Sequence, residues 1–400
     1  MAQSNSYTMI EITNKADCCG CEACVQVCPK RCISFVEDAE GFRYPSVNTD
    51  LCVNCSLCEK VCPVINQNNK KEPLEVFAAK NKNEQDLLLS SSGGIFLILA
   101  NRILKEGGVV FGARFDEQWN VVHSYSETEE GVRAFMGSKY VQSRIGSSYM
   151  EVRDFLLKGR KVLYSGTSCQ IAGLKRFLQR DFDNLLTIDM ICHGVPSPKV
   201  WRRYLTEISQ DNKGSIKSIS FRDKQINWKN FSFTLHFAET STDRNQSAFS
   251  LTHMHKEDPY MRLFLRNLIL RPSCYKCPAK QGKSWSDLTI ADFWGIEKFY
   301  PNFDDERGVG LLMVNSEKGR NAIDLAEDAM LMKEVSLSEA TECNPSYYYS
   351  VGIPDKRDKC FQMINSSRKD INTIVYKLFH ISIGTRIKRK MINTLHAFIK

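Results

Sequence analysis

The stretches CCGCEACVQVCP (residues 18–29) and CVNCSLCEKVCP (residues 52–63) decide how the first part of this chain folds. Each contains the spacing C-x2-C-x2-C-x3-C-P. Three thiolates at successive x2 spacings wrap one side of an iron–sulfur cubane, and the fourth, beyond a short helical stretch, reaches a second cluster. A zinc ribbon is the alternative, but a zinc ion needs only four ligands and leaves two complete four-cysteine runs unexplained. The sequence therefore predicts two 4Fe–4S clusters.

This cysteine module resembles the bacterial two-cluster ferredoxins. The resemblance implies that one cluster is held by Cys18, Cys21, Cys24 and Cys62, and the other by Cys28, Cys52, Cys55 and Cys58. Cys19 and Cys32 lie outside the pattern and are expected to be bystanders. Such clusters carry single electrons and perform no bond chemistry, so we expect the rest of the chain to contain the group that they serve.

The composition is that of a cytoplasmic globular protein. Its 400 residues, 42% of them hydrophobic, suffice for two or three domains. Residues 356–400 carry eleven basic and two acidic side chains, which account for the net charge of +8 and leave the remainder near neutral. That distribution argues against a nucleic-acid-binding body. No apolar run approaches the roughly 18 residues that span a bilayer, no secretory core is present, and the cysteines are expected to be reduced.

Texture divides the chain into a ferredoxin domain at 1–70, a second domain at 71–350 and a basic helical tail at 351–400. Alternation around an acidic turn predicts a hairpin over residues 33–47. We expect strands at 76–80, 109–115, 161–166 and 185–191, helices at 95–105, 147–158 and 170–179, and a mixed sheet from the later apolar runs. The fold class expected is α+β: a ferredoxin-type domain followed by an α/β mixed-sheet domain.

Three segments of the second domain favour a dinucleotide. Residues 90–94, SSSGG, open a helix with the free N–H groups and dipole that a phosphate needs, although an empty cap has the same sequence. Residues 166–170, GTSCQ, join a strand to a helix without the glycine pattern of a Rossmann site. Residues 137–143, GSKYVQS, are either a dinucleotide contact or an ordinary loop. The candidate cofactor-binding residues are Ser92, Gly93, Gly94, Lys139, Tyr140, Ser143, Gly166, Thr167 and Gln170.

Together these motifs resemble the coenzyme F420 hydrogenase/dehydrogenase beta subunit family. The matching segments include SSGGIF (91–96), GSKYVQS (137–143), GTSCQIAGLK (166–175), ICHGVPSP (191–198), FRDKQINW (221–228), RPSCYKC (271–277), DLTIADFWG (287–295) and RGVGLLMVN (307–315). The resemblance implies an FAD-binding redox domain, often preceded by a two-cluster ferredoxin module. Ser168 departs from the proline usual in the family, which is expected to loosen that turn without abolishing binding.

The resemblance also groups four further cysteines, because Cys169, Cys192, Cys274 and Cys277 all lie inside matched segments. They suffice for a third 4Fe–4S cluster. A structural zinc, a CxxC dithiol or buried thiols remain alternatives. Cys343 and Cys360 have no partner pattern and are expected to be structural.

Other polar residues carry two interpretations each. His193 follows a strand and is a candidate proton donor beside the flavin, a hydrogen-bond partner of a cluster, or a satisfied polar residue. Lys139 and Lys175 are phosphate partners or surface charges. Arg222, Asp223, Lys224 and Trp228 suit an anionic or planar partner or form a solvated turn, and Asp292 with Trp294 is also compatible with the core.

The resulting interpretation is an FAD- and iron–sulfur-dependent oxidoreductase with a redox partner protein, such as ferredoxin or another oxidoreductase subunit. Flavin is needed as the converter, since clusters do not accept hydride and a nicotinamide or deazaflavin does not readily give single electrons. Coenzyme F420 is one candidate two-electron substrate. The alternatives are a non-catalytic electron-relay subunit and a reductase of a bulky organic substrate.

The basic tail supports a weaker hypothesis. Arg386, Lys388, Arg389 and Lys390 lie among apolar residues, a mixture that suits peripheral contact with an anionic membrane or docking of a partner. A terminal helix packed on its own domain is the favoured alternative.

Overall fold

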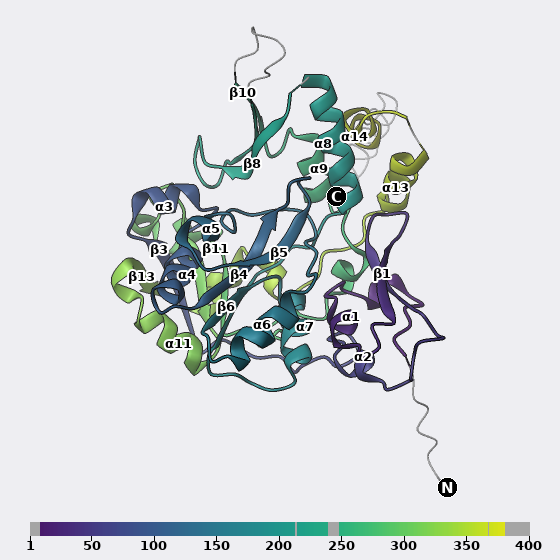
Figure 1. Cartoon of the computed structure of the whole chain (residues 1–400). Coiled ribbons are helices and arrows are strands. Elements are labelled where there is room, and N and C mark those ends of the chain that lie inside the picture. The colour runs from purple at the N-terminus through teal and green to yellow at the C-terminus, as the bar shows by residue number, and fades with distance from the viewer. Residues whose placement is uncertain (1–8, 213, 239–247, 367, 381–400) are drawn as a thin grey trace, which may run out of the picture.

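The ferredoxin lobe is organised around a hairpin (Figure 1). The computed structural model describes residues 9–212, 214–238, 248–366 and 368–380. Strands β1 (Ile33–Glu37) and β2 (Arg43–Val47) pair antiparallel, with Ile33 opposite Val47, which confirms the predicted hairpin. The short elements η1 (Lys15–Asp17), α1 (Ala23–Val27) and α2 (Leu57–Lys60) carry the cysteine runs.

The second domain is built on one eight-stranded mixed sheet in the order β13-β3-β12-β11-β7-β6-β4-β5. The strands are β3 (Glu75–Asn81), β4 (Val109–Phe115), β5 (Val121–Ser126), β6 (Val162–Ser165), β7 (Leu185–Met190), β11 (Leu288–Asp292), β12 (Gly310–Val314) and β13 (Met330–Glu334). β4, β6, β7 and β11 run parallel, and their neighbours at both sides run antiparallel to them. The expected strands and the mixed sheet are confirmed.

Helices cover both faces of this sheet because its central strands are buried apolar runs. On one face pack α4 (Ile95–Lys105), α5 (Glu129–Arg133) and α11 (Glu317–Asp324). On the other pack α6 (Ser148–Leu157) and α7 (Ser168–Leu178), which also receive Cys19, Cys21 and Val61 of the ferredoxin lobe. The ferredoxin lobe is therefore attached to the α6–α7 face.

The directions of the strands bring several loops to one edge of the sheet. β3, β4, β6, β7 and β11 all end at this edge, while β12 begins there, since Gly310 pairs with Ala79 and with Asp292. The helix α3 (Glu84–Leu89) and the loop before α4 follow β3 at the same edge. In open α/β sheets ligands bind outside the carboxyl ends of the strands. We call this the carboxyl edge.

Strands β8 (Ile216–Asp223), β9 (Ser232–Phe237) and β10 (Phe249–Met254) form a separate antiparallel sheet. The expectation that all later strands share one mixed sheet is wrong for β8 and β9. The long helix α8 (Pro198–Asn212) carries the chain away from the main sheet before they form. This upper lobe has its own aromatic core, shared with α9 (Pro259–Leu265), α13 (Arg357–Ser366) and α14 (Ile371–Phe379).

The remaining elements are short. They are η2 (Pro272–Lys276), α10 (Ile296–Phe299), η3 (Pro301–Phe303), η4 (Glu327–Ala329), α12 (Leu337–Glu342) and η5 (Pro345–Tyr347). In the ranges that the structure describes, no helix is long and apolar enough to cross a membrane. The membrane hypothesis for residues 384–400 falls outside the described residues.

Gly93 gives a test of the packing at the carboxyl edge. A Cβ at this position would lie 2.3 Å from the Ala79 carbonyl oxygen and 2.5 Å from the Gly310 nitrogen, both of them backbone atoms. We expect Gly93→Ala to lower the free energy of unfolding by about 1–3 kcal/mol, the usual range for overpacking. Thermal unfolding measures this. Gly352→Ala is the control because a Cβ there meets nothing within 4 Å, and equal stability of the two variants would contradict the packing argument.

Candidate functional site

The two cysteine runs share an unusual backbone geometry. Gly20 (φ 73°) and Glu22 (φ 58°) flank Cys21, and Asn54 (φ 51°) and Ser56 (φ 57°) flank the equivalent Cys55. Left-handed residues other than glycine are uncommon and mark a conformation that the local structure imposes. The repeat seen in the sequence is thus also a repeat in backbone conformation. In each half, the residues just before and just after the second cysteine of the C-x2-C-x2-C-x3-C spacing are left-handed.

The first predicted cysteine group comes together in the structure. Burial raises the pKa of Cys24, and the thiols of Cys18 and Cys62 raise it further. A hydrogen bond with Cys19 lowers the pKa of Cys21, while burial and the thiols of Cys24 and Cys62 raise it by more. These electrostatic interactions place the four predicted ligands close to one another. The assignment of a cluster to them stays a prediction.

The second group lines a small, partly open pocket. Its cysteine lining consists of Cys28, Cys52, Cys55, Cys58 and Cys32. Cys32 was expected to be a bystander, yet its Sγ lies 3.3 Å from the Sγ of Cys28. A spacing pattern that counts only x2 and x3 intervals misses it, because Cys32 reaches the pocket through the start of the hairpin.

The third group joins three separate segments of the second domain. Burial raises the pKa of Cys274, and Cys192, Cys277 and Cys169 raise it further. Burial likewise raises the pKa of Cys192 to about 12, although Lys280 opposes this shift. A small, partly open pocket lined by Cys192 and Cys277 adjoins the group. The four cysteines that the sequence grouped therefore do lie together.

The distances between possible metal ligands distinguish a site for a single metal ion from a site for an iron–sulfur cluster. Across the described ranges, no three His, Cys, Asp or Glu side chains meet closely enough to hold one metal ion. A cubane spreads its four thiolates around four irons, which requires a wider arrangement than one ion does. The donor chemistry of each group, four thiols, fits a 4Fe–4S cluster.

Cys19 connects two of the three groups. It interacts with Cys169 of the third group and with Cys21 and Cys18 of the first. The expectation that Cys19 is a bystander is therefore not what the structure shows, since the side chain lies at the boundary of both groups. Cys343 lies beside Lys298, and Cys360 lies in the aromatic core of the upper lobe, against which Cys274 also packs.

The loops with candidate flavin contacts all lie at the carboxyl edge. The Ser91 hydroxyl accepts a hydrogen bond of 2.7 Å from the backbone nitrogen of Ser138, which joins the first loop to the segment 137–143. Gln170 donates to the Ser143 hydroxyl at 2.8 Å and accepts from the Thr167 nitrogen at 2.9 Å, joining that segment to the loop after β6. The structure thus brings the three segments together.

Several of these candidates already have protein partners. Ser92 donates to the Val309 carbonyl at 3.0 Å, and Gly93 is enclosed by backbone. Gly94 has φ 78° and begins α4. Thr167 and Gln170 form a capping box of α7. The need for glycine at position 93 comes from packing against β3 and β12, which differs from the expected close approach of a phosphate.

Two lysines at this edge form no ion pair. Lys139 donates to the carbonyls of Met136 and Gly137, and Lys224 to those of Leu87, Ser92 and Arg307. Burial lowers the pKa of each to about 7, and for Lys224 the neighbouring Arg222 adds to the effect. No carboxylate among the described residues forms an ion pair with either ammonium group.

Unpartnered polar atoms accompany these lysines. Burial lowers the pKa of His123 to about 4, so this ring is neutral, and its Nε2 lies 3.0 Å from the Ser165 carbonyl. Its Nδ1 has no partner in the described part of the chain, and the same holds for Arg222 Nε and Asp292 Oδ1. His123 was missed from the sequence, because a histidine inside an ordinary strand carries no motif.

The remaining candidate residues make contacts within the protein. His193 Nε2 lies 2.6 Å from Asn267 Oδ1, and burial lowers its pKa. Its role as a proton donor stays a prediction. Trp228 is fully buried and stacks on Trp294 with ring centroids 5.2 Å apart, while Arg222 forms an ion pair with Asp292. This set is part of the core at the carboxyl edge. Tyr140 contacts it through Arg222.

Known protein families match both parts of the chain. Residues 17–66 match the 4Fe-4S dicluster domain, and residues 159–340 match the C terminus of the coenzyme F420 hydrogenase/dehydrogenase beta subunit. The first match supports iron–sulfur clusters in the ferredoxin lobe. Both matches fall within the boundaries expected from the sequence.

Two curated relatives agree with these matches. The chain is 24% identical to a subunit of the F(420)H(2) dehydrogenase of Methanosarcina mazei over 231 residues, 53% of this chain and 63% of that protein. It is 35% identical to an uncharacterized ferredoxin of Methanocaldococcus jannaschii over 52 residues, 13% of this chain and 66% of that protein. The match therefore spans less than two thirds of each relative.

Among solved structures, a chain of the F420-reducing [NiFe] hydrogenase complex from Methanosarcina barkeri aligns with 16% identity and a TM-score of 0.47, covering 70% of this chain and 91% of that one. The family matches and the dehydrogenase relative show an iron–sulfur protein related to F420 hydrogenase and dehydrogenase subunits. Residues 159–340 are thus similar to the C terminus of the coenzyme F420 hydrogenase/dehydrogenase beta subunit, and residues 17–66 in front of them match a 4Fe-4S dicluster domain.

Proposed function

We propose that this chain is an iron–sulfur flavoprotein oxidoreductase, in which FAD exchanges an electron pair with one partner and 4Fe–4S clusters pass single electrons to or from another. The observation that carries the proposal is the continuity of the cysteine groups from the ferredoxin lobe to the sheet domain. Cys24 interacts with Cys58 of the second group, and Cys19 interacts with Cys169 of the third. Three clusters held by these groups would form a route for electrons between the two domains.

The carboxyl edge fits an anionic dinucleotide. Lys139 and Lys224 offer two ammonium groups that no described carboxylate pairs with, and the pKa of each is lowered to about 7 by burial. A bound pyrophosphate would supply negative charge to both. The N–H groups at the start of α4 and α7 face the same edge, where helix dipoles favour anions.

The protein's own groups would perform three tasks at this edge. The ammonium groups of Lys139 and Lys224 would bind and orient the pyrophosphate, His123 would accept a hydrogen bond at Nδ1, and the Trp228–Trp294 stack would exclude water from below. When bound, FAD supplies the conversion between two-electron and one-electron transfer. Gly166 leaves this side of the loop after β6 free of a side chain.

The identity of the two-electron partner is part of the proposal. The matching family model and the Methanosarcina mazei relative are both named for F420 chemistry, which supports a reduced deazaflavin as that partner. A redox protein such as ferredoxin, or another oxidoreductase subunit, would exchange electrons with the clusters. The second candidate function, a non-catalytic relay subunit, is favoured by the protein contacts that Ser92, Thr167 and Gln170 already make.

The third cluster is tested by iron content. Replacing Cys274 and Cys277 by Ser removes two of four proposed ligands, so reconstituted protein is expected to fall from about twelve irons per chain to about eight. Cys343→Ser is the matched control, since Cys343 lies beside Lys298 and belongs to none of the three groups. Iron analysis together with zinc analysis measures the change. Unchanged iron, or stoichiometric zinc, would rule out the third cluster.

The flavin site is tested by the pH dependence of FAD binding to the flavin-free, cluster-loaded chain. With the Lys139 pKa at about 7, the free site loses its proton above that pH. An anion at the ammonium raises the pKa, so binding above pH 7 must take up a proton. The FAD affinity is therefore expected to fall between pH 7 and 9 by up to about tenfold per pH unit for each of the two lysines, Lys139 and Lys224.

Equilibrium dialysis at each pH measures this affinity. Lys139→Met is expected to bind FAD more weakly at pH 7 and with a flatter pH profile, whereas the exposed Lys158→Met is the control and should match the wild type. A wild-type profile in Lys139→Met would remove Lys139 from the site. Gly93→Val is unsuitable for this purpose because the position is packed against backbone.

An anaerobic spectral titration separates the enzyme from the relay. Purified protein is mixed in turn with reduced F420, NADH, NADPH and reduced ferredoxin. Flavin bleaching by a deazaflavin or nicotinamide, followed by cluster reduction, is the expected result. Bleaching by ferredoxin alone points to a substrate reductase. A chain that binds no flavin after reconstitution contradicts the proposed enzyme and leaves the relay subunit.

A further inference from the structure

We propose that Arg271 is a positioning residue that raises the reduction potential of the iron–sulfur cluster at Cys18 and joins this cluster to the one at Cys274. Arg271 lies just before η2 of the sheet domain and points into the ferredoxin lobe. The proposal rests on the clusters of the proposed function, and concerns a residue to which neither the cysteine pattern nor the candidate flavin site gives a role.

The guanidinium of Arg271 is only 1% exposed. Its Nε donates to the Cys18 carbonyl at 2.7 Å, and one terminal nitrogen lies 3.4 Å from the Cys18 Sγ. The same nitrogen donates to the Arg43 carbonyl at 2.9 Å, and the other to Gln142 Oε1 at 3.0 Å. All three guanidinium nitrogens of Arg271 are thus directed at the ferredoxin lobe or at Gln142, which contacts that lobe.

The charge of Arg271 has no carboxylate partner among the described residues. Burial lowers its pKa, but Cys18, Tyr44, Cys19 and Cys274 raise it by more. The backbone nitrogen of Cys274 donates to the Arg271 carbonyl at 2.9 Å, and the Cys18 Sγ lies 3.4 Å from the guanidinium, so Arg271 contacts residues of two cysteine groups. The rings of Tyr44 and Phe42 lie at 4.4 Å and 5.6 Å from the guanidinium carbon, and cation–π attraction contributes to holding it there.

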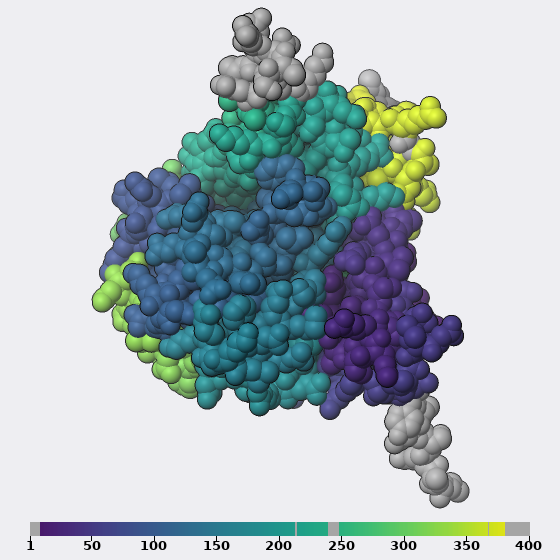
Figure 2. Space-filling view, viewed as in Figure 1, coloured from purple at the N-terminus to yellow at the C-terminus, as the bar shows by residue number. Residues whose placement is uncertain are grey.

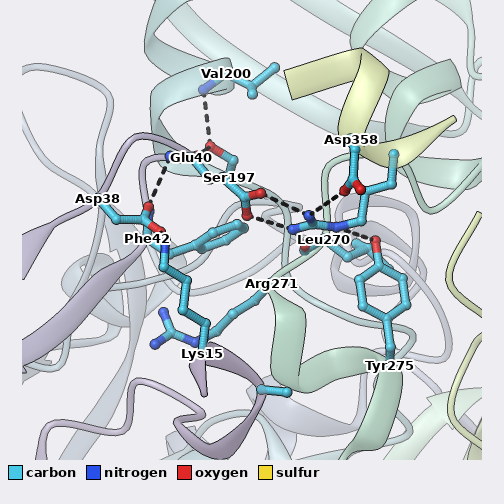
Figure 3. A network of polar contacts seen from close by, with 12 residues as sticks. Lys15, Asp38, Glu40, Phe42, Ser197, Val200, Leu270, Arg271, Tyr275 and Asp358 are labelled. Carbon is cyan, nitrogen blue, oxygen red and sulfur yellow. Dashed lines mark hydrogen bonds and ion pairs between the residues drawn. The ribbon is translucent and has the colours of Figure 1, made fainter. Parts of the chain in front are cut away.

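A second buried arginine at the same boundary shows the contrast. Arg357 of α13 contacts the hairpin turn through Glu40, whose two carboxylate oxygens lie 2.6 Å and 2.8 Å from its nitrogens. Arg357 also donates to the Tyr275 hydroxyl at 3.1 Å. Figure 3 shows Glu40 and Tyr275 directed toward each other, with Arg271 beside Phe42. The charge of Arg357 is neutralised by an acid, whereas Arg271 has only thiols, carbonyls and rings around it.

An isolated buried cation is costly unless a negative group compensates for it. Reduction adds a negative charge to a cluster, so a cation beside it favours the reduced state. Net charge and hydrogen bonds to the sulfurs are both factors that set the potential of such clusters. Arg271 supplies both at Cys18, and its charge acts on the group of Cys274 as well.

The local backbone is shaped to accept this side chain. Gly20, between Cys19 and Cys21, has φ 73°, and a Cβ there would lie 2.6 Å from Gln142 Nε2 and 2.9 Å from an Arg271 nitrogen. Gln142 in turn donates to the Cys19 carbonyl at 3.3 Å. Arg271 and Gln142 thus hold the backbone on both sides of Cys18 and Cys19, where two cysteine groups meet.

The test is a redox titration of the full, reconstituted chain followed by electron paramagnetic resonance. Arg271→Gln removes the charge and is expected to lower the midpoint potential of the Cys18 cluster, with a smaller shift in the same direction for the Cys274 cluster. The cluster at Cys28 should be unaffected. Arg357→Gln is the matched control because its charge is paired with Glu40, and its midpoint potentials should equal those of the wild type.

Iron content distinguishes a failure of the proposed function from a failure of the role proposed for Arg271. Wild-type protein without clusters would refute the proposed function, whereas loaded Arg271→Gln protein with wild-type potentials refutes the role of Arg271 alone. An equal shift in Arg357→Gln also refutes it, since loosening of the boundary would then be the cause. If Arg271→Gln does not retain iron, the titration uses Arg271→Met, which also removes the charge and keeps an unbranched side chain. Its potential is expected below that of the wild type, and an unchanged value overturns the proposal.

Discussion

The close contact between Gly173 of α7 and Cys21 fixes the ferredoxin lobe on the sheet domain. A Cβ on Gly173 would lie 2.8 Å from the Cys21 Cβ and 3.0 Å from its Sγ. Only a residue without a side chain lets α7 approach the cysteine run this closely. Because α7 also carries Cys169 in its first turn, the same contact sets the separation between the first and third cysteine groups. The space-filling view shows the two lobes pressed together without a gap at this boundary (Figure 2).

Local patterns predicted most of the individual elements, because each depends on its own residues. The helix expected at 95–105 coincides with α4, and the strands at 109–115 and 185–191 agree with β4 and β7 to within a residue. The separation of β8 and β9 into another sheet could not be predicted in this way. Their alternation describes a strand with one buried face, but which sheet buries that face depends on contacts distant in sequence.

In the candidate sites too, the features set by neighbouring residues could be predicted, and those set by contacts distant in sequence could not. The x2 and x3 spacings identified the two cysteine runs, since ligand geometry constrains near neighbours along the chain, whereas the exchange of Cys28 and Cys62 and the third group came from resemblance to known families. Cys19 and Cys32 were misjudged because their contacts, to Cys169 and Cys28, come from tertiary folding and from the hairpin. His123 and the pairing of Ser143 with Gln170 likewise arise where segments distant in sequence meet. Polar residues in ordinary strands and loops give no periodic signal of such a meeting.

The paired left-handed residues around Cys21 and Cys55 have a consequence for the origin of the ferredoxin lobe. Two halves with the same backbone turn are the product expected from duplication of a single ancestral half. In the proposed ligand arrangement, each half sends its last cysteine, Cys28 or Cys62, into the other half's cluster. Neither half is then self-sufficient. The reciprocal exchange makes the two halves interdependent, so that neither can be lost without damage to both metal centres.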